Sequence, residues 1–303
     1  MFKAKAENPP LAIALMLLAT VFIASSTAFA KALGSGTLGG ILHPLQVTFG
    51  RFLFAGLFFS GVVAVLRPRF TRVHWVLHVQ RTSCGWAGVT LMFAAVAAIP
   101  LADATAISFL NPVFAMIFAI PLLGERVGPV RWAAAGLAFC GAMILLRPGT
   151  GAFQSGALLA LGAALALGLE VIFIKRLAGR EAPVQVLLVN NLIGLSIATA
   201  VMLPFWVWPS PAQWAGMAGV GLSMALAQSC FFNAVARAEA SLVVPFSYAT
   251  LLSAAVIDFT VFGTMPVPVS MLGAAVIIAG GVLLAWREGL AKKRPTAPQP
   301  NVQ

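Results

Sequence analysis

The chain repeats its own pattern at a spacing of 139 residues. From about residue 44 to residue 145, the apolar segments of the first half superpose on those of the second half, and scattered identities keep the same register. The matched residues are Pro44 and Pro183, Gln46 and Gln185, Phe93 and Phe232, Ser108 and Ser247, Gly124 and Gly263, Pro129 and Pro268, and Gly141 and Gly280. An internal repeat of this kind constrains the architecture before any single residue is considered.

The composition places the chain in a membrane. Of its 303 residues, 60% are hydrophobic and 9% are charged, whereas a soluble domain carries about 25% charged residues. A soluble protein of this length could not bury so much apolar surface, so lipid must be the solvent. The net charge of +11 lies in short loops, without a basic patch interleaved with exposed aromatic residues, and we therefore expect no nucleic-acid partner.

The apolar segments predict an all-α integral membrane protein with ten transmembrane helices. Each segment is long enough to cross a hydrocarbon core of about 30 Å. The expected helices are at residues 10–30, 44–66, 82–99, 104–123, 128–146, 154–174, 184–206, 212–235, 242–262 and 267–286. Five crossings per repeat is an odd number, so the second copy is inverted relative to the first, as in secondary transporters with a central substrate site.

The repeats divide the chain into three parts. Residues 1–147 form the first repeat, residues 153–289 form the second, and we expect the basic, proline-rich residues 290–303 to be a disordered cytoplasmic tail. Basic residues gather in the loops at one end of the predicted bundle and at both termini, while the loops at the other end hold only Lys31 and Arg147. This bias predicts that both termini lie in the cytoplasm. A cleavable signal peptide ending near Ala30 is the alternative for the first segment, although its apolar run is longer than usual.

Several short motifs, in their order and spacing, carry a family resemblance. They are Phe29-Ala30-Lys31, Arg51-Phe52-Leu53, the run at 107–114, the run at 123–126 and Gly141-Ala142. With these motifs the chain resembles the EamA-type, ten-helix members of the drug/metabolite transporter superfamily over nearly its whole length. The second repeat departs from the pattern, because Thr264 stands opposite Glu125 and Asn190 stands opposite Arg51.

The resemblance implies a secondary transporter in the bacterial cytoplasmic (inner) membrane. It would export small polar metabolites, above all amino acids with broad specificity, by alternating access through a cavity between the repeats. Proton-coupled efflux of cationic drugs and a channel-like facilitator are the alternatives. The chain has no HExxH, GxSxG or Walker motif, so we expect neither an enzyme nor an ATP-driven pump. Cys84, Cys140 and Cys230 have no metal-ligand spacing, we expect no metal or organic cofactor, and a monomer is favoured.

Few ionisable residues lie inside the predicted helices, and each is a candidate for function because a charge in lipid is costly. Glu170 is expected to bind a proton or a substrate ammonium group, or alternatively to pair with a loop cation such as Arg237. Asp258 is a candidate for ion coupling or a structural interface charge. Arg51 is expected either to attract a carboxylate or to pair with Asp258, and Lys31 is expected to be a solvated interfacial cation.

Uncharged polar residues form a second group of candidates for the cavity lining, with interhelical hydrogen bonding as the alternative role. This group consists of Ser26, Asn111, Asn190, Gln228, Asn233 and Tyr248. Pro112 and Pro245 can bend their helices, and broken helices near the midplane are where transporter sites form. His43, His74 and His78 are expected to be surface residues in or near loops.

Overall fold

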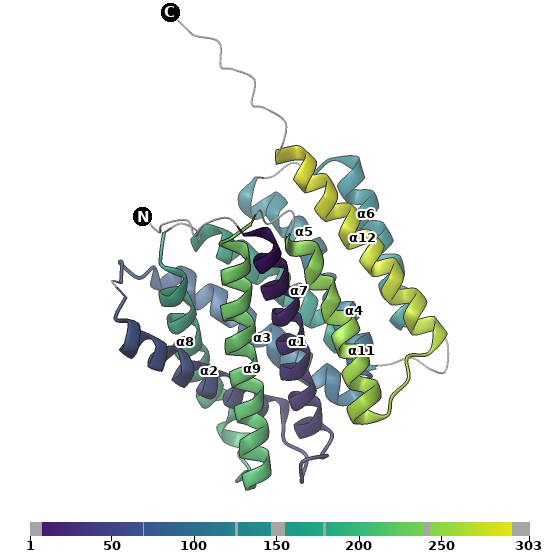
Figure 1. Ribbon diagram of the computed structural model, residues 1–303. Helices are drawn as coiled ribbons and strands as arrows, with labels where there is room; N and C mark the ends of the chain where they lie inside the picture. Colours follow the sequence, from purple (N-terminus) through teal and green to yellow (C-terminus); the bar gives the residue numbers. More distant parts are fainter. Residues whose placement is uncertain are drawn as a thin grey trace, which may run out of the picture.

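The structure, a computed structural model, describes residues 8–68, 70–124, 127–146, 155–177, 180–238 and 243–292, without the side chains of 244–245 and 284–292. In this part of the chain every regular element is helical, which confirms the predicted all-α class (Figure 1). The elements are α1 (Pro9–Gly34), α2 (Pro44–Leu66), α3 (Trp75–Ala98), α4 (Leu101–Ser108), α5 (Asn111–Leu123), α6 (Pro129–Leu146), α7 (Ser155–Leu177), α8 (Pro183–Met202), η1 (Leu203–Phe205), α9 (Pro211–Val235), η2 (Val244–Tyr248), α11 (Ala249–Phe262) and α12 (Pro268–Lys292).

These elements make ten crossings when α4 is counted with α5, α8 with η1, and η2 with α11. Seven helices of the described residues are long and apolar enough to span a membrane. The stretches Phe246–Phe262 and Pro268–Leu283 are shorter apolar helices. The remaining crossing is α3, which is more polar because it carries His78 and Arg81. The beginning of α1 and the end of α12 lie at the same end of the bundle (Figure 1), as an even number of crossings requires.

The fourth predicted helix is broken. We expected a continuous helix at 104–123, but α4 ends at Ser108 and α5 begins at Asn111. Pro112 explains the break, because it has no N–H to donate to the carbonyl of Ser108 and its ring crowds that carbonyl. The equivalent crossing of the second repeat changes from η2 to α11 after Tyr248, which lies 139 residues after Phe109 in the first break.

Other boundaries differ from the prediction at the ends of helices. The third crossing begins at Trp75 rather than at residue 82, and α12 continues to Lys292, so residues 290–292 of the predicted tail are helical. The rest of that tail, residues 293–303, lies outside the described residues, as do residues 125–126 and Arg147. Gly124 and Gly263, a matched pair, end α5 and α11 in the left-handed conformation, with φ of 68° and 64°. This conformation favours glycine because it lacks a Cβ atom.

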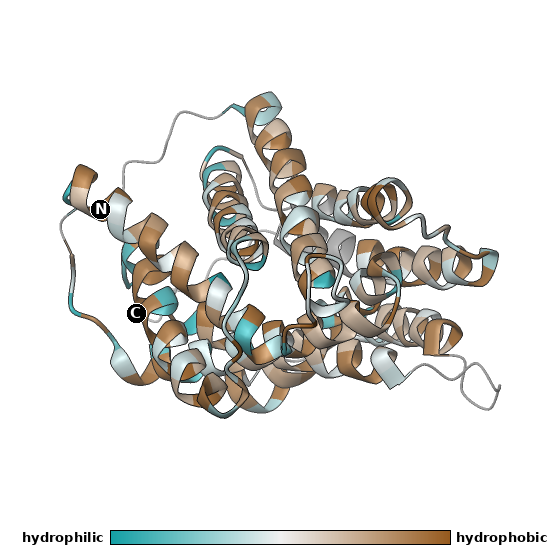
Figure 2. Ribbon diagram, turned by 90° about the horizontal axis from the view of Figure 1, so that it is seen from below, coloured by the Kyte–Doolittle hydropathy of each residue, from teal (hydrophilic) through white to brown (hydrophobic). Residues whose placement is uncertain are grey.

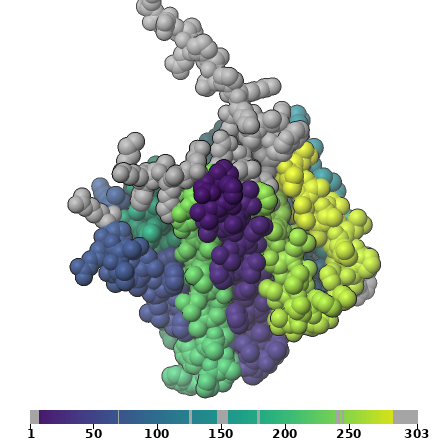
Figure 3. All heavy atoms as spheres, in the orientation of Figure 1, coloured from purple at the N-terminus to yellow at the C-terminus, as the bar shows by residue number. Residues whose placement is uncertain are grey.

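The two repeats are interleaved rather than placed side by side. The first crossing packs on the eighth, α1 against α9, and the third packs on the sixth, α3 against α7. The first crossing corresponds to the sixth in the repeat, and the third corresponds to the eighth. The two contacts are therefore equivalent, as expected for inverted copies. The helices α2 and α8 contact each other, and so do α6 and α12. Figure 3 shows α1 lying between α9 and α11 on one face of the molecule.

Large apolar side chains cover the outside of the bundle. Leu252, Val256 and Phe259 of α11 are 71%, 60% and 51% exposed, and Met271 and Leu272 of α12 are similarly exposed. Figure 2 shows brown, apolar residues on most turns of the helices. In water this surface would be unstable, whereas in a bilayer it faces lipid chains.

Two matched glutamines make the same contact at opposite ends of the bundle. Gln46, at the start of α2, donates from Nε2 to the carbonyl of Val207 at 2.6 Å and accepts from the Val207 N–H at 3.2 Å. Gln185, at the start of α8, donates to the carbonyl of Thr71 at 3.1 Å and accepts from its N–H at 2.8 Å. Both glutamines are fully buried. Each glutamine therefore binds both the N–H and the carbonyl of one residue in a loop of the other repeat.

A buried carboxylate lies beside the second of these contacts. Glu181, in the loop before α8, accepts from the His74 N–H at 2.8 Å, contacts the imidazoles of His74 and His78 at 2.9 and 3.0 Å, and accepts from Gln185 at 2.8 Å. The prediction of surface histidines was therefore wrong for His78, which is fully buried. Burial alone raises the pKa of Glu181, but the hydrogen bonds from His74 and His78 outweigh it, and the pKa lies below its ordinary value of 4.5.

Glycines allow α6 and α12 to approach closely. A Cβ atom at Gly141 would lie 2.7 Å from both the carbonyl oxygen of Gly273 and the side chain of Ile277. Gly280 similarly faces the backbone of Ala138, with 2.7 Å to its nitrogen. Small residues commonly mediate such contacts between membrane helices. In contrast, a Cβ atom at Gly136, which lies on α6 like Gly141, would have no described atom of a neighbouring element within 4 Å.

The Glu181 cluster predicts a pH-dependent contribution to stability. Because the folded pKa lies below 4.5, the stabilisation is fully present above that value and is lost as the pH falls through the folded pKa. We expect Glu181→Gln to lower the free energy of unfolding by about 1–3 kcal/mol at neutral pH. Melting of the purified variant and parent between pH 3 and pH 8 measures this; a difference in Tm that grows as the pH falls from 4.5 to 3 would contradict the assignment.

The glycine contact predicts a contrast between two substitutions in α6. Gly141→Ala should destabilise the protein by about 1–3 kcal/mol, because the added methyl group meets backbone atoms that cannot move aside. Gly136→Ala is the matched control and should leave Tm unchanged or slightly raised. Thermal unfolding of both variants in detergent tests the contrast, which fails if the two variants melt alike.

Candidate functional site

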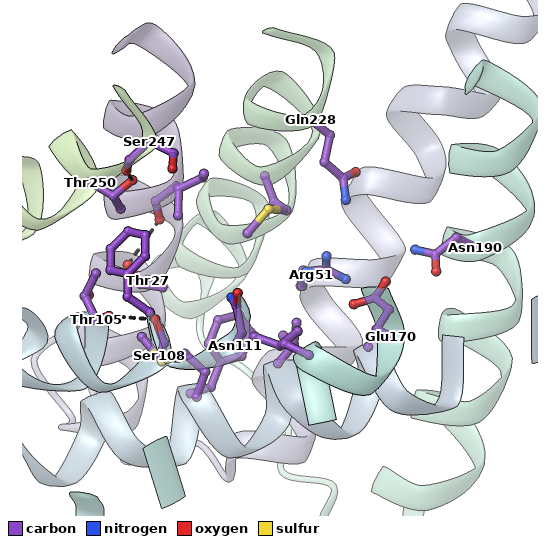
Figure 4. Close-up of a pocket in the computed structure, with 18 of the residues that line it drawn as sticks. Thr27, Arg51, Thr105, Ser108, Asn111, Glu170, Asn190, Gln228, Ser247 and Thr250 are labelled. Carbon is purple, nitrogen blue, oxygen red and sulfur yellow. Dashed lines mark hydrogen bonds between the residues drawn. The ribbon is translucent and has the colours of Figure 1, made fainter. Parts of the chain in front are cut away.

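A cavity of about 290 Å³ lies between the two repeats, beside the break between α4 and α5 and the change from η2 to α11. Its walls come from α1, α2, α3, α4, α5, α7, α8, α9, η2 and α11, so both repeats contribute. Figure 4 shows polar side chains from several of these helices directed toward a common space. Anything bound there would contact residues of both repeats.

The lining follows the internal repeat. Five pairs of residues that lie 139 positions apart in the sequence have both members in the described lining of the cavity. These pairs are Arg51 and Asn190, Gly85 and Met224, Val89 and Gln228, Ser108 and Ser247, and Asn111 and Thr250. Phe109 and Tyr248, also a matched pair, stack on each other with ring centroids 4.8 Å apart. The pseudo-symmetry axis that relates the repeats therefore passes through this region.

Aromatic and sulfur-containing side chains form the apolar wall. Phe52, Phe93 and Phe109 line the cavity together with Met92 and Met224. Phe52 and Phe93 are almost fully buried, with 1% and 2% exposure, so their rings are held rigidly by the surrounding helices. Such walls suit flat apolar or aromatic groups, because rings stack and sulfur contacts ring edges favourably.

Three charged residues stand at one end of the cavity. Arg51 of α2 and Glu170 of α7 both line it, and Figure 4 shows their charged groups directed into the same space. Arg81 of α3 pairs with Glu170 from the other side, with 3.3 Å between Nε and Oε1. Arg51 is 5% exposed and its guanidinium lies 4.4 Å from the ring of Phe52. Among the described residues, Nε and Nη1 of Arg51 have no hydrogen-bond acceptor.

Gly85 makes room for the carboxylate of Glu170. A Cβ atom at Gly85 would lie 2.8 to 2.9 Å from the carboxyl carbon and both carboxylate oxygens of Glu170. Gly85 follows Arg81 by one helical turn on α3, and residues at this spacing share a face of a helix. This face of α3 thus supplies both the cation and the space that hold Glu170 at the cavity wall.

The structure brings five of the candidate lining residues together and places three elsewhere. Arg51, Glu170, Asn111, Asn190 and Gln228 all line the cavity. Asn190 accepts a hydrogen bond from Thr82 at 3.0 Å, while the side-chain oxygen of Gln228 has no partner among the described residues. Glu170 pairs with Arg81 of α3, a partner that the sequence interpretation did not consider.

The other three candidates contact other parts of the protein. Ser26 is fully buried and donates to the carbonyl of Val220 in α9 at 2.9 Å. Asn233 donates to the carbonyl of Ser229 and accepts from Arg237 near the end of α9. Tyr248 stacks on Phe109, and its hydroxyl fills the space beside Gly281 of α12. None of these three is among the described lining residues.

Asp258 lies in a separate pocket, away from Arg51. It pairs with Lys31 of α1 and accepts from the Ala102 N–H at 3.1 Å. The alternative pairing of Arg51 with Asp258 is therefore not formed, and Lys31 is an ion-paired residue rather than a solvated cation. Lys31 also lies 4.5 Å from the ring of Phe262. Asp103 lines the same pocket and accepts from Ser270 at 3.0 Å.

Sequence reasoning missed small hydroxyl residues of the lining. These are Thr105, Ser108, Ser247 and Thr250; Thr27, which follows the candidate Ser26 on α1, also lines the cavity. The 139-residue register contained a signal for two of them, because Ser247 and Thr250 are the counterparts of Ser108 and of the predicted Asn111. Within the described residues, no group of three or more His, Cys, Asp or Glu side chains could hold a metal ion, and the cavity offers only one carboxylate.

A family model matches almost the entire chain. The EamA-like transporter family model aligns twice, with residues 10–147 and with residues 154–286. The two matched segments correspond to the two halves related by the internal repeat. A solved crystal structure with a TM-score of 0.62 and 20% identity, covering 95% of this chain and 100% of its own, shares the fold.

Similar proteins include transporters with different substrates. A riboflavin transporter of Rhizobium johnstonii is 32% identical over 253 residues, which are 82% of this chain and 83% of the relative. An S-adenosylmethionine uptake transporter of Rickettsia prowazekii is 24% identical over 83% of this chain and 86% of its own. The pseudopaline exporter CntI of Pseudomonas aeruginosa is 25% identical over 63% of this chain and 66% of its own.

Proposed function

This chain belongs to the EamA-like transporter family, and on that basis we propose that its central cavity carries riboflavin, or a similar flat heteroaromatic metabolite, across the membrane. One observation supports this substrate class above all. The Nε and Nη1 donors of Arg51, which have no acceptor among the described residues, stand at one end of a cavity walled by the rings of Phe52, Phe93 and Phe109. Riboflavin combines a flat ring system with two carbonyl acceptors and a hydroxylated chain, so each part of the wall has a complementary group.

The charges of the cavity argue against a cationic substrate. Arg51 and Arg81 are opposed by the single carboxylate of Glu170, and that carboxylate is already paired with Arg81. S-adenosylmethionine carries a sulfonium and an ammonium group against one carboxylate, so it would bring a net positive charge toward Arg51. Charges of the same sign in a buried site repel strongly. The same argument applies to cationic drugs.

Amino acids are the second candidate, and a specific arrangement favours them. Arg51 and Glu170 have opposite charges and face the same cavity, so a carboxylate and an ammonium group of one zwitterion could contact both. To bind in this way, the ammonium group would have to share Glu170 with Arg81. Riboflavin requires no such sharing, which is why we rank it first.

Transport through this cavity follows from the inverted repeats. Exchanging the conformations of the two repeats would open the cavity to the opposite side of the membrane, while matched residues such as Ser108 and Ser247 keep the lining similar. The interrupted crossings at Phe109 and Tyr248 provide backbone that can adjust at the cavity. The absence of a Walker motif in the sequence leaves substrate or ion gradients as the driving force, and these set the direction of net transport.

We further propose that both termini face the cytoplasm, so that the loop after α1 is external and the loop after α2 is internal. Thr37→Cys and Arg72→Cys, both at exposed positions, test this in a variant lacking the three native cysteines. An impermeant thiol reagent added to intact cells should label position 37 and should label position 72 only after the cells are broken. The reverse pattern would invert the proposed orientation.

The substrate proposal predicts the fluxes of purified protein in liposomes. Riboflavin should equilibrate across the membrane faster than a mixture of labelled amino acids, and S-adenosylmethionine should be transported least. Arg51→Gln should reduce riboflavin flux by about tenfold or more, because a charged hydrogen-bond donor is worth about 1.5–3 kcal/mol. Uptake of the fluorescent flavin and of labelled amino acids is measured in parallel.

Matched variants separate a local effect from general damage. Arg72→Gln removes a guanidinium from an exposed loop position and should leave flux unchanged. Glu170→Gln distinguishes the two candidates, because it removes the only carboxylate available to an ammonium group in the cavity. It should abolish amino-acid flux but spare riboflavin. Amino-acid flux without riboflavin flux in the parent protein would reverse our ranking.

A further inference from the structure

The charged end of the cavity contains more positive than negative charge. Arg51 and Arg81 are 5% and 4% exposed, and Glu170 is the only carboxylate in contact with either of them among the described residues. The other acidic residues whose side chains the structure describes have partners elsewhere. Asp258 pairs with Lys31, Glu181 with His74 and His78, and Asp103 bonds Ser270.

We infer that the central cavity binds one monovalent anion at Arg51. The inference deepens the proposed function, because it concerns the same cavity and adds a charge requirement to its ligand. Arg81 neutralises Glu170 from the α3 side, with 3.3 Å between Nε and Oε1. The guanidinium of Arg51 is then left without a full counter-charge on the side that faces the cavity.

Two physical costs make the empty state unfavourable. A net charge inside a membrane protein is expensive unless it is paired or hydrated, and buried donors without acceptors lose their hydrogen bonds with water. Arg51 incurs both, since Nε and Nη1 have no acceptor among the described residues. The ring of Phe52 at 4.4 Å stabilises the cation only partly. An anion in the cavity would remove both costs at once.

The geometry selects a small anion with a single charge. The cavity volume of about 290 Å³ accommodates a halide or a carboxylate. A second negative charge would leave the site with a net negative charge, because the carboxylate of Glu170 already offsets one of the two guanidinium groups. Arg51 presents two donors without acceptors among the described residues, Nε and Nη1, and an anion can accept a charge-assisted hydrogen bond from either of them. The anion can be a carboxylate of the transported molecule, or a free ion that occupies Arg51 until a neutral substrate such as riboflavin displaces it.

Anion binding is measured on the purified protein by thermal unfolding, without any transport. Sodium chloride and sodium acetate are titrated separately against sodium sulfate at constant ionic strength. We expect at least one of the two monovalent anions to raise Tm in a saturable manner, by about 3 °C or more. Protection by both indicates a site for free anions, whereas protection by acetate alone indicates a site for the carboxylate of a substrate.

Three variants assign the effect to Arg51. Arg51→Gln should abolish the saturable protection, and Arg72→Gln, at an exposed loop position, should retain it. Glu170→Gln removes the opposing charge and should lower the half-saturating anion concentration by about tenfold or more. This third variant keeps the test valid if Arg51→Gln does not fold, because an unchanged or higher half-saturating concentration would overturn the proposal.

The remaining outcomes are also decisive. If neither anion protects the parent protein, or if Arg51→Gln is protected as well as the parent, the anion site does not exist. Riboflavin flux in liposomes is scored independently. Flux without anion protection refutes the anion site and leaves the proposed function intact, whereas anion protection without flux of riboflavin or amino acids refutes the proposed function alone.

Discussion

A polar group inside a bilayer must find its partner within the protein, and the fold described here depends on this requirement. Each repeat supplies the partners that the other needs. Ser26 in α1 bonds the backbone of α9, Thr82 in α3 bonds Asn190 in α8, and Lys31 in α1 pairs with Asp258 in α11. None of these bonds lies within one repeat, so neither half could satisfy its polar groups alone. Interleaving of the two halves follows directly from this shared need.

The fold was predictable from the sequence because its signals are long and repeated. The register that pairs Gly124 with Gly263 predicted two helices with the same ending, and both glycines end their helices in the same conformation. Local chemistry was less predictable. The sequence placed Pro112 in a helix but did not reveal that the helix stops at Ser108, because membrane helices often tolerate proline when neighbouring groups replace the lost hydrogen bond.

The candidate site was only partly predictable, for a different reason. Composition shows that Arg51, Glu170 and Asp258 are rare charges in apolar helices, but which of them pair depends on helix rotation and on distances between distant segments. The predicted third helix began at residue 82, which left Arg81 outside it, yet Arg81 lies within α3 and is the partner of Glu170. The register restricts the choice, since Arg51 and Asn190 face one cavity from equivalent positions. The register does not explain why one of these two positions is a charged arginine and the other a neutral asparagine.

The two glutamine contacts have a mechanical consequence. A carrier that alternates its access must open one end of its cavity while the other end stays closed. Gln46 and Gln185 hold Val207 and Thr71 at opposite ends at the same time. They join α2 and α8, which also contact each other, through one loop at each end of the bundle. If both contacts persist while access alternates, α2 and α8 would move as one unit, and the movement that carries a substrate would belong to the helices around them.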